Sequence, residues 1–457
     1  MSTIASNATA EEPREAIGIG ATVALIVGIV VGAGIFKAPS LVAGFTEHPT
    51  WMFAAWALGG VVSLIGALCY AELATAFPSA GGDYHFLHRA YGRSIAFLFA
   101  WARFSVVTTG SIALLGFVFG DYMAQVLPLG PHGPALYAAT AILVLTAVNL
   151  RGLRTGSLVQ TLLTIAEVGG LLLVAIAGLF LVSGTGALSS TPVHDVTATP
   201  PMPSMFGLAM VFVLLTFGGW NEAAYVSAEV RDAKRNIVRA LVLSIVLLTA
   251  LYLVVVWAYW RGLGLEGMAK SNAVAADLLR LAFGERGAKL VSIMVAVSAL
   301  TSINATMIVG ARTNFAVGRD WPVLAWLGQW NGARGTPSRG LLVQSAAALV
   351  LVIVGASAVG GGFKAMVEFT APVFWLFFLL SGISLFVLRH TAADTPRPFR
   401  VPLYPVVPAL FCASCAFMLW SSLTYVYDQR LGGLNAAWIG VIVLAAGGLL
   451  LAVVRQR

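Results

Sequence analysis

Two glycine-containing stretches interrupt otherwise apolar segments of the chain. The first is VGAGIFKAP at residues 31–39, and the second is FGGWN at residues 217–221. Both lie near the middle of an apolar run long enough to cross a bilayer, which takes about 20 helical residues. Glycine lowers helix stability, and unwound backbone inside a membrane is tolerated only where it is buried or lines a wet cavity. The two stretches therefore predict helices that break beside a central site.

The composition around these stretches is that of a membrane protein. Of the 457 residues, 59% are hydrophobic and 10% are charged, against roughly 45 to 50% and 25% in soluble domains. A soluble enzyme, a disordered chain and a free nucleic-acid binder are thereby excluded. The apolar runs predict an all-α integral membrane protein with twelve transmembrane segments. The segments are expected at 17–44, 50–76, 93–126, 135–150, 156–183, 204–229, 237–260, 286–316, 340–359, 364–389, 404–427 and 434–454.

Charge placement predicts the topology. Most of the 27 Lys and Arg residues fall in connections that face the cytoplasm if the N-terminus lies inside. Cytoplasmic loops of membrane proteins carry this excess, so both termini are expected in the cytoplasm, with the chain in an inner or plasma membrane. Residues 1–16 are then a cytoplasmic tail, 17–389 a transmembrane core of segments 1 to 10, and 390–457 an inner connection followed by segments 11 and 12.

The spacing of the two interruptions suggests an internal repeat. They lie five segments apart, in the first helix of each half of the core. This fits an inverted repeat of segments 1 to 5 and 6 to 10, the arrangement in which transporters place substrate between discontinuous helices. Close packing of helices through glycine is the alternative, and it stays open at this point.

Several motifs, in their order and spacing, carry a family resemblance. They are GAGIF at 32–36 with Pro39, YAEL at 70–73, GGDY at 81–84, GWN at 219–221, KRNI at 234–237 and RPFRVPLYP at 397–405. Over essentially its whole length the chain resembles an amino acid permease of the amino acid-polyamine-organocation (APC) superfamily, nearest the branch of L-type amino acid exchangers. The resemblance implies a 5+5 inverted-repeat fold like that of the leucine transporters, with broken helices 1 and 6 and alternating access.

The interruptions also suggest how an amino acid would bind. The N-terminus of a half-helix exposes backbone N–H donors and partial positive charge, which suit a carboxylate. Free carbonyls at the end of a broken helix suit an ammonium. An aromatic side chain could cover the ligand, and the resembling exchangers often carry an aromatic two positions before Phe217, where this chain has Leu215. The predicted substrate-binding residues are Gly32, Ala33, Gly34, Ile35, Leu215, Phe217, Gly218, Gly219, Trp220 and Asn221.

Glu167 is the predicted coupling residue. In the family pattern, a Gln on segment 5 is followed seven residues later by a Lys that fills a site holding sodium in distant relatives. Here that pair is Gln160 and Glu167. The carboxyl lies roughly 16 Å into the segment, where a carboxylate costs about 2.5 to 3.5 kcal/mol. Glu167 should therefore bind a proton, which is favoured, or sodium; a structural pair with Arg103 is the alternative.

Two other charged residues are singled out. Lys37 follows the first interruption and is expected to face an outer vestibule or to extend to the lipid headgroups. Glu72 lies near an inner helix end, where gating or loop contacts with Arg residues are expected.

The leading hypothesis is a secondary active transporter of amino acids, coupled to protons. The alternatives are an exchanger without ion coupling, or a transporter of amines, polyamines or inorganic ions in the same superfamily. No HExxH motif and no Ser/His/Asp-like cluster occurs in the spans, so we predict no enzyme, no metal and no cofactor. Cys412 and Cys415 lie in an apolar run without further ligands and are interpreted as packing residues. The expected partners are an amino acid, a coupling proton or sodium, and the lipid bilayer, without nucleic acid.

Overall fold

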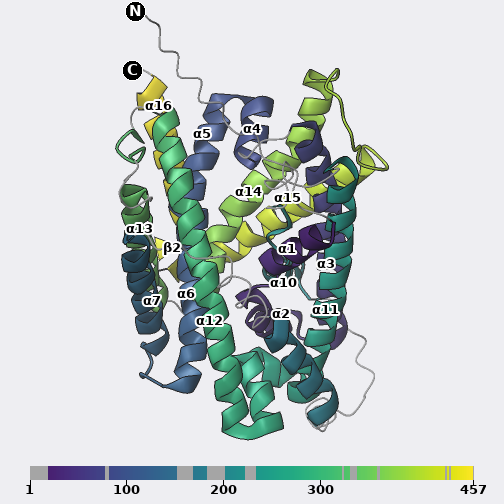
Figure 1. The fold of residues 1–457 in the computed structure, drawn as a ribbon, viewed down its shortest axis with the longest axis vertical. Helices are drawn as coiled ribbons and strands as arrows, with labels where there is room; N and C mark the ends of the chain where they lie inside the picture. Colours follow the sequence, from purple (N-terminus) through teal and green to yellow (C-terminus); the bar gives the residue numbers. More distant parts are fainter. Residues whose placement is uncertain are drawn as a thin grey trace, which may run out of the picture.

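The fold is a bundle of helices, most of them along one axis of the molecule (Figure 1). The computed structural model describes residues 19–77, 82–151, 168–182, 201–221, 233–321, 324–329, 337–357, 361–427, 430–431 and 434–455. The first half contains α1 (Ile19–Val30), η1 (Ala33–Phe36), α2 (Ala38–Thr46), α3 (Pro49–Ala76), α4 (Asp83–Tyr91), α5 (Arg93–Ala102), η2 (Arg103–Thr108), α6 (Thr109–Val126), α7 (Gly133–Leu150), η3 (Ala177–Leu181) and α10 (Pro203–Thr216). The second half contains α11 (Ala233–Lys270), α12 (Val274–Asp320), α13 (Ser338–Ala356), α14 (Gly362–Thr391), α15 (Val406–Tyr427), β1 (Arg430–Leu431), β2 (Leu434–Asn435) and α16 (Ala436–Arg455).

The described helices agree with the predicted segments in different degrees. Eight helices are long and apolar enough to cross a membrane, and they coincide with segments 2, 3, 4, 7, 8, 9, 10 and 11. Segments 1, 5, 6 and 12 coincide with shorter helices: α1 with α2, Val168–Leu181, α10, and Ile442–Ala452 within α16. A multi-pass helical membrane protein is thereby confirmed. The count of twelve spans and the 5+5 repeat stay predictions.

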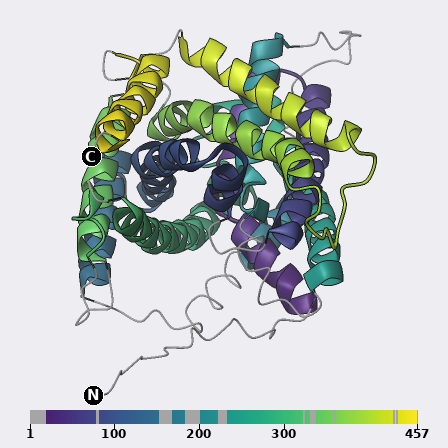
Figure 2. The ribbon, with the colours of Figure 1, turned by 90° about the horizontal axis from the view of Figure 1, so that it is seen from above.

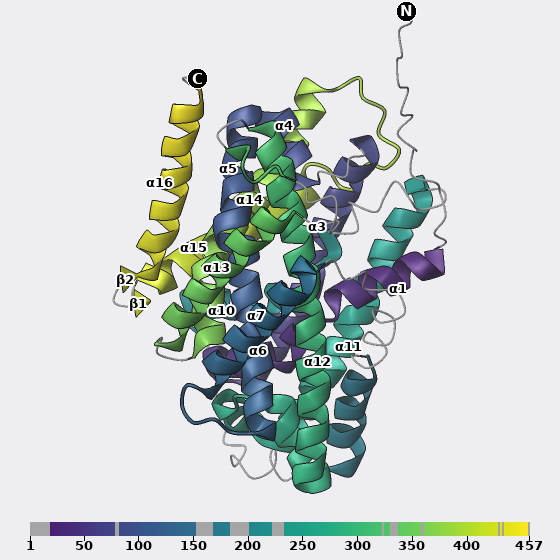
Figure 3. The ribbon, with the colours of Figure 1, turned by 60° about the vertical axis from the view of Figure 1, so that its left-hand side comes forward.

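The helices pack in groups. On one side α12 packs on α6, which in turn packs on α7 and α13; on the other side α11 packs on α3. Figure 2 shows the bundle from above, where α14 and α15, which pack on each other, run across the view. The last helix, α16, stands at the edge of the bundle beside α5 (Figure 3). Buried apolar residues of α1 to α3, α10 to α12 and α14 form one continuous core.

The connection at 261–285 is largely helical. Helix α11 continues to Lys270 and α12 begins at Val274, with sharp breaks at Gly264 and Gly284, where φ is 68° and 64°. Glycine adopts this left-handed region without strain. The spacing of Val274, Ala275, Leu278, Leu279 and Leu281 predicts a short amphipathic pattern here, and the structure agrees with it at all of these residues except Leu281. Its inward residues are at most 1% exposed, whereas Leu281 is 57% exposed; the inward residues are Val274, Ala275, Leu278 and Leu279.

Three short elements were absent from the predicted arrangement. Strands β1 and β2 form a two-residue antiparallel ladder between α15 and α16, with Arg430 opposite Asn435. Helix α4 follows α3 and is fixed through Asp83, whose carboxylate accepts hydrogen bonds from Tyr70 at 2.5 Å and Ser381 at 2.8 Å. Because Tyr70 belongs to α3 and Ser381 to α14, one buried carboxylate joins three helices.

Glu72 joins α3 to the connection between α14 and α15. Its carboxylate is fully buried and accepts two hydrogen bonds from the guanidinium of Arg389, that of Nε at 2.7 Å. It also accepts the backbone N–H of Val401 at 2.7 Å, and Arg397 lies 3.4 Å away. The expected contacts with Arg residues are confirmed. The two guanidinium groups and the N–H compensate the desolvation of this carboxylate.

Neutralising Glu72 should destabilise the fold. In Glu72→Gln the two Arg side chains lose their buried counter-charge, which costs about 3 to 5 kcal/mol when one partner of a buried pair is removed. We expect a lower unfolding midpoint in a thermal melt of the purified protein. Glu266→Gln is the matched control, because its pair with Lys270 is exposed and should leave the midpoint unchanged. Equal midpoints for the two variants would contradict a role for the Glu72 contacts in stability.

Candidate functional site

The first break lies where it was predicted. Helix α1 ends at Val30, Gly32 is extended with φ −140° and ψ −175°, and a short 3-10 turn, η1, precedes α2. No side chain caps the N-terminal end of η1. Gly32 and Gly34 are half-buried, whereas Ala33 and Ile35 are buried. Gly32 and Gly34 are therefore the partly exposed positions of this turn.

The second break begins at the end of α10. The helix stops at Thr216, and Phe217 to Gly219 form a turn that leads to Trp220 and Asn221. Gly219 has φ of 111°, in the left-handed region that favours glycine. At Gly218 an added Cβ would lie 2.9 Å from the carbonyl oxygen of Leu215, so a larger residue does not fit this turn.

The two breaks meet each other. A Cβ on Gly34 would lie 3.3 to 3.4 Å from atoms of Thr216, so the glycine allows the closest part of this approach. The hydroxyl of Tyr252, on α11, lies 3.2 Å from the carbonyl oxygens of both Val30 and Thr216. These are the last residues of α1 and α10. The hydroxyl of one buried tyrosine is therefore the hydrogen-bond donor for the last carbonyl of both broken helices. These carbonyls have no partner within their own helix.

Aromatic side chains on the two sides of the second break have different surroundings. Phe217 is fully buried between Trp56 and Tyr252, with ring centroids 6.3 and 5.0 Å away. Trp220 instead lines a small cavity and packs edge-on against Tyr70 at 5.3 Å. Of these two aromatic residues of the second break, Trp220 is the one that borders the cavity.

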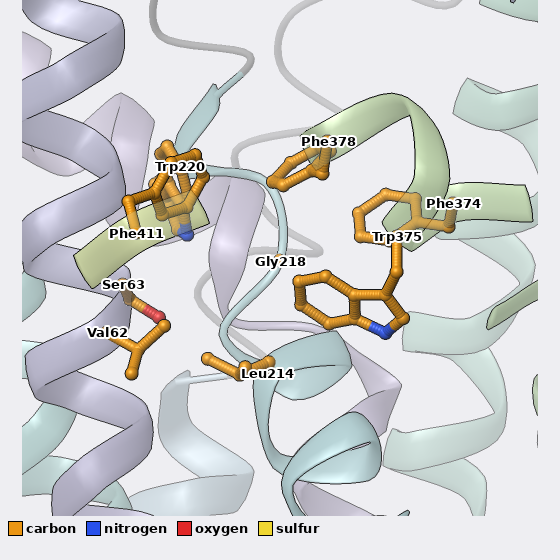
Figure 4. Close-up of a pocket in the computed structure, with 9 residues that line it drawn as sticks. All are labelled: Val62, Ser63, Leu214, Gly218, Trp220, Phe374, Trp375, Phe378 and Phe411. Carbon is orange, nitrogen blue, oxygen red and sulfur yellow. The ribbon is translucent and has the colours of Figure 1, made fainter. Parts of the chain in front are cut away.

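This cavity adjoins the second break and not the first (Figure 4). Its lining is aromatic and aliphatic, apart from Ser63, whose hydroxyl makes no hydrogen bond within the described part of the chain. Its volume is about 10 Å³, which is room for about one water molecule. This cavity is therefore too small to hold an amino acid. The lining residues are Val62, Ser63, Leu214, Gly218, Trp220, Phe374, Trp375, Phe378 and Phe411.

Lys37 does not occupy the predicted place. Its side chain is only 8% exposed, and its ammonium lies 2.6 Å from Asp121 of α6 and 2.7 Å from the carbonyl oxygen of Asn272, to which it donates a hydrogen bond. The expectation of a vestibule or headgroup position was wrong, because α6 supplies a carboxylate within reach of the ammonium. Tyr122, the residue that follows Asp121, donates a hydrogen bond to the carbonyl of Phe36 at 2.5 Å.

The predicted coupling residue, Glu167, lies outside the described residues, as does Gln160. Arg103, the alternative partner, begins η2, a six-residue π-helical stretch between α5 and α6. Extra-wide turns of this kind occur frequently at functional sites. Among the described residues, no group of three or more His, Cys, Asp and Glu side chains is placed to hold a metal ion.

Sequence reasoning missed the residues that hold the breaks in place. Tyr252, Tyr122 and Asp121 sit inside ordinary apolar segments, and their partners lie 222, 86 and 84 residues away along the chain. The one available signal was the pair Asp121 and Tyr122, which lie side by side in a predicted membrane segment. Polar groups in such a segment need partners.

Helix interruptions that meet inside a multi-pass helical membrane protein are the arrangement in which many transporters build their substrate sites. The chain belongs to the amino acid permease family, which it matches over residues 17–447.

Similarity to individual proteins agrees with this family. The chain is 30% identical to the b(0,+)-type amino acid transporter 1 of Homo sapiens over 416 residues, covering 89% of this chain and 82% of the relative. It is 27% identical to the serine/threonine exchanger SteT of Bacillus subtilis strain 168, covering 90% and 91%. It is 29% identical to the large neutral amino acids transporter small subunit 2 of Mus musculus, covering 89% and 77%. The family resemblance is confirmed, and so is the prediction of no enzyme, since all three relatives are transporters by name.

Tyr252→Phe should impair transport more than it impairs folding. The variant keeps the ring packing but removes the donor shared by the carbonyls of Val30 and Thr216, and a buried acceptor left unsatisfied costs about 1 to 3 kcal/mol. We expect reduced amino acid uptake in proteoliposomes by a folded protein. Tyr137→Phe is the matched control, because its hydroxyl makes a comparable, exposed hydrogen bond to Leu127. Parental uptake by Tyr252→Phe would show that the shared donor is dispensable.

Proposed function

We propose that the chain is a secondary transporter of amino acids that works by alternating access, with both termini in the cytoplasm. The observation that carries the proposal is the meeting of the two breaks, with Gly34 against Thr216 and Tyr252 between their carbonyl ends. Membership of the amino acid permease family supports the same function. The b(0,+)-type, large neutral and serine/threonine relatives are all named for amino acids.

The substrate carboxylate binds at the first break in this proposal. The backbone at 32–35 begins a helical turn without a side-chain cap, so its N–H groups and the partial positive charge of the turn face the ligand. Gly32 and Gly34 leave room for an oxygen to approach the backbone. A charged side chain is not needed for this step, because N–H groups oriented by a helical turn bind anions directly.

The substrate ammonium binds at the second break. Leu215 was expected to offer a carbonyl, but that oxygen already accepts the N–H of Gly218 at 3.0 Å, and Thr216 accepts from Tyr252. We therefore assign the ammonium to the carbonyls of Phe217 and Gly218, with Asn221 as a polar neighbour. Trp220 covers the bound amino acid from the side of the cavity, and Gly219 allows the turn that directs these carbonyls.

Coupling to protons through Glu167 is the favoured form of the proposal. A carboxylate that replaces the family's fixed ammonium leaves a site that needs a positive charge, and a proton supplies it at low cost in the membrane interior. Exchange without a coupled ion is the second candidate, and the name of the Bacillus subtilis relative, a serine/threonine exchanger, favours it.

Both charged ends of the substrate should be required for binding. Competition against labelled amino acid uptake should be strong for the parent amino acid and at least tenfold weaker for its decarboxylated amine and for its deaminated acid. Each analogue leaves one helix break without its partner, and tenfold corresponds to about 1.4 kcal/mol. Equal competition by the amine would instead favour a transporter of polyamines or other organic cations.

Glu167→Gln should separate coupling from substrate exchange. The amide cannot carry the proton, so the variant should lose accumulation driven by a pH gradient while keeping amino acid counterflow in proteoliposomes. A parallel sodium gradient serves as the control. The proton proposal fails if the parent follows sodium and ignores pH, or if the variant accumulates substrate like the parent. Misfolding of the variant that is rescued by also neutralising Arg103 would favour the structural pair.

A further inference from the structure

Two consecutive residues of α6 hold two consecutive residues at the outer side of the first break. Asp121 pairs with the ammonium of Lys37 at 2.6 Å, and Tyr122 donates to the carbonyl of Phe36 at 2.5 Å. The carbonyl of Asn272, in the connection between α11 and α12, accepts a hydrogen bond from Lys37 at 2.7 Å. We call Lys37, Asp121, Tyr122 and Asn272 the outer contact.

The outer contact is largely shielded from water. Phe36 and Tyr122 are at most 1% exposed, and the side chains of Lys37 and Asp121 are 8% and 17% exposed. The inward residues of the connection at 261–285 lie over the same region. Among them, Ala275 is fully buried. A charged pair in such surroundings is stable only as a pair, because separating it without water leaves two uncompensated charges.

The two sides of the first break are attached to different helices. On the inner side, Val30 is tied through Tyr252 to α11 and to the end of α10. On the outer side, Phe36 and Lys37 are tied to α6 and to Asn272. The η1 turn, which carries the proposed carboxylate site, therefore spans the space between these two attachments. Its geometry depends on both of them.

Opening the outer side would expose the pair to water. Hydration compensates both charges of Lys37 and Asp121 once they separate, whereas separation in the dry interior is prohibitive. The pair thus has two stable arrangements, paired and buried or separated and hydrated, and no stable arrangement between them. The same separation would release the outer end of η1.

We propose that Lys37 and Asp121 are positioning residues that close the outer side of the substrate path and set the η1 turn, so that the carboxylate site is complete only while that side is closed. This inference rests on the proposed function. It assigns the ion pair a role in substrate binding, although neither side chain needs to touch the substrate.

The test compares Asp121→Asn, Lys37→Arg and the parent, with Lys270→Gln as the matched control for an outer ion pair that is exposed. Uptake kinetics are measured in proteoliposomes with each of the twenty L-amino acids, and the amino acid with the strongest parental counterflow is used for all variants. We expect Asp121→Asn to raise KM at least tenfold with a smaller change in maximal rate, because the site is formed less often. Lys37→Arg keeps the positive charge, so its KM should lie between those of Asp121→Asn and the parent. The KM of Lys270→Gln should match that of the parent.

Hydrogen–deuterium exchange supplies a readout of the turn itself. In Asp121→Asn, exchange should increase over residues 31–46 and not in α3, and the transported amino acid should restore protection only at about tenfold higher concentration than in the parent. A parental KM in Asp121→Asn overturns the proposal. So does increased exchange throughout the bundle with a lower unfolding midpoint, which is the signature of a purely structural pair.

The two readouts separate this inference from the proposed function. If the parent shows no counterflow with any amino acid, the proposed function fails, and with it the role in carboxylate binding. If the parent transports and the exchange pattern of Asp121→Asn over 31–46 is parental, the inference alone is wrong.

Discussion

A helix that stops inside a membrane leaves carbonyl and N–H groups that no water can reach, and the whole interior of this protein is arranged around that constraint. On one side of the first break, Tyr252 places its hydroxyl between the carbonyls of Val30 and Thr216. On the other side, Tyr122 donates to the carbonyl of Phe36. Both phenols come from neighbouring helices that are regular at these positions, Tyr252 from the part of α11 before its break at Gly264 and Tyr122 from α6. These helices thus provide hydrogen bonds that the interrupted helices cannot make for themselves.

Buried charged groups at the two ends of the bundle are likewise stabilised by groups from other parts of the chain. Near one end, Glu72 of α3 is enclosed by Arg389, Arg397 and a backbone N–H. Near the other, Lys37 is enclosed by Asp121 and a backbone carbonyl. Glu72 and Lys37 each have an opposite charge and a backbone partner, a condition under which a charged group is tolerated away from water. Between these levels the broken helices have no ion pair among the described residues, so the centre is held by backbone and aromatic contacts.

Local sequence predicted the helices and the position of the breaks because these depend on local properties. The apolar runs and the glycines at 32 and 34 act on their own stretch of backbone, and α1 ends within two residues of Gly32. The amphipathic part of the connection at 261–285 was predicted from its apolar spacing, whereas the breaks at Gly264 and Gly284 were not predicted. Lys37 was placed wrongly because its partner, Asp121, is 84 residues away. Tyr252 carried no local sign of its role, because a tyrosine in an apolar helix is typical of many packed cores.

The contacts of Glu72 also bear on the order in which the chain is made. Arg389 follows Glu72 by 317 residues, which at ribosomal rates corresponds to roughly 15 to 60 s of synthesis. During that time α3 must already occupy the membrane with a carboxylate whose counter-charges do not yet exist. Glu72 therefore lacks its two Arg counter-charges until the last quarter of the chain emerges, and these contacts of α3 can form only after the end of α14 has been made.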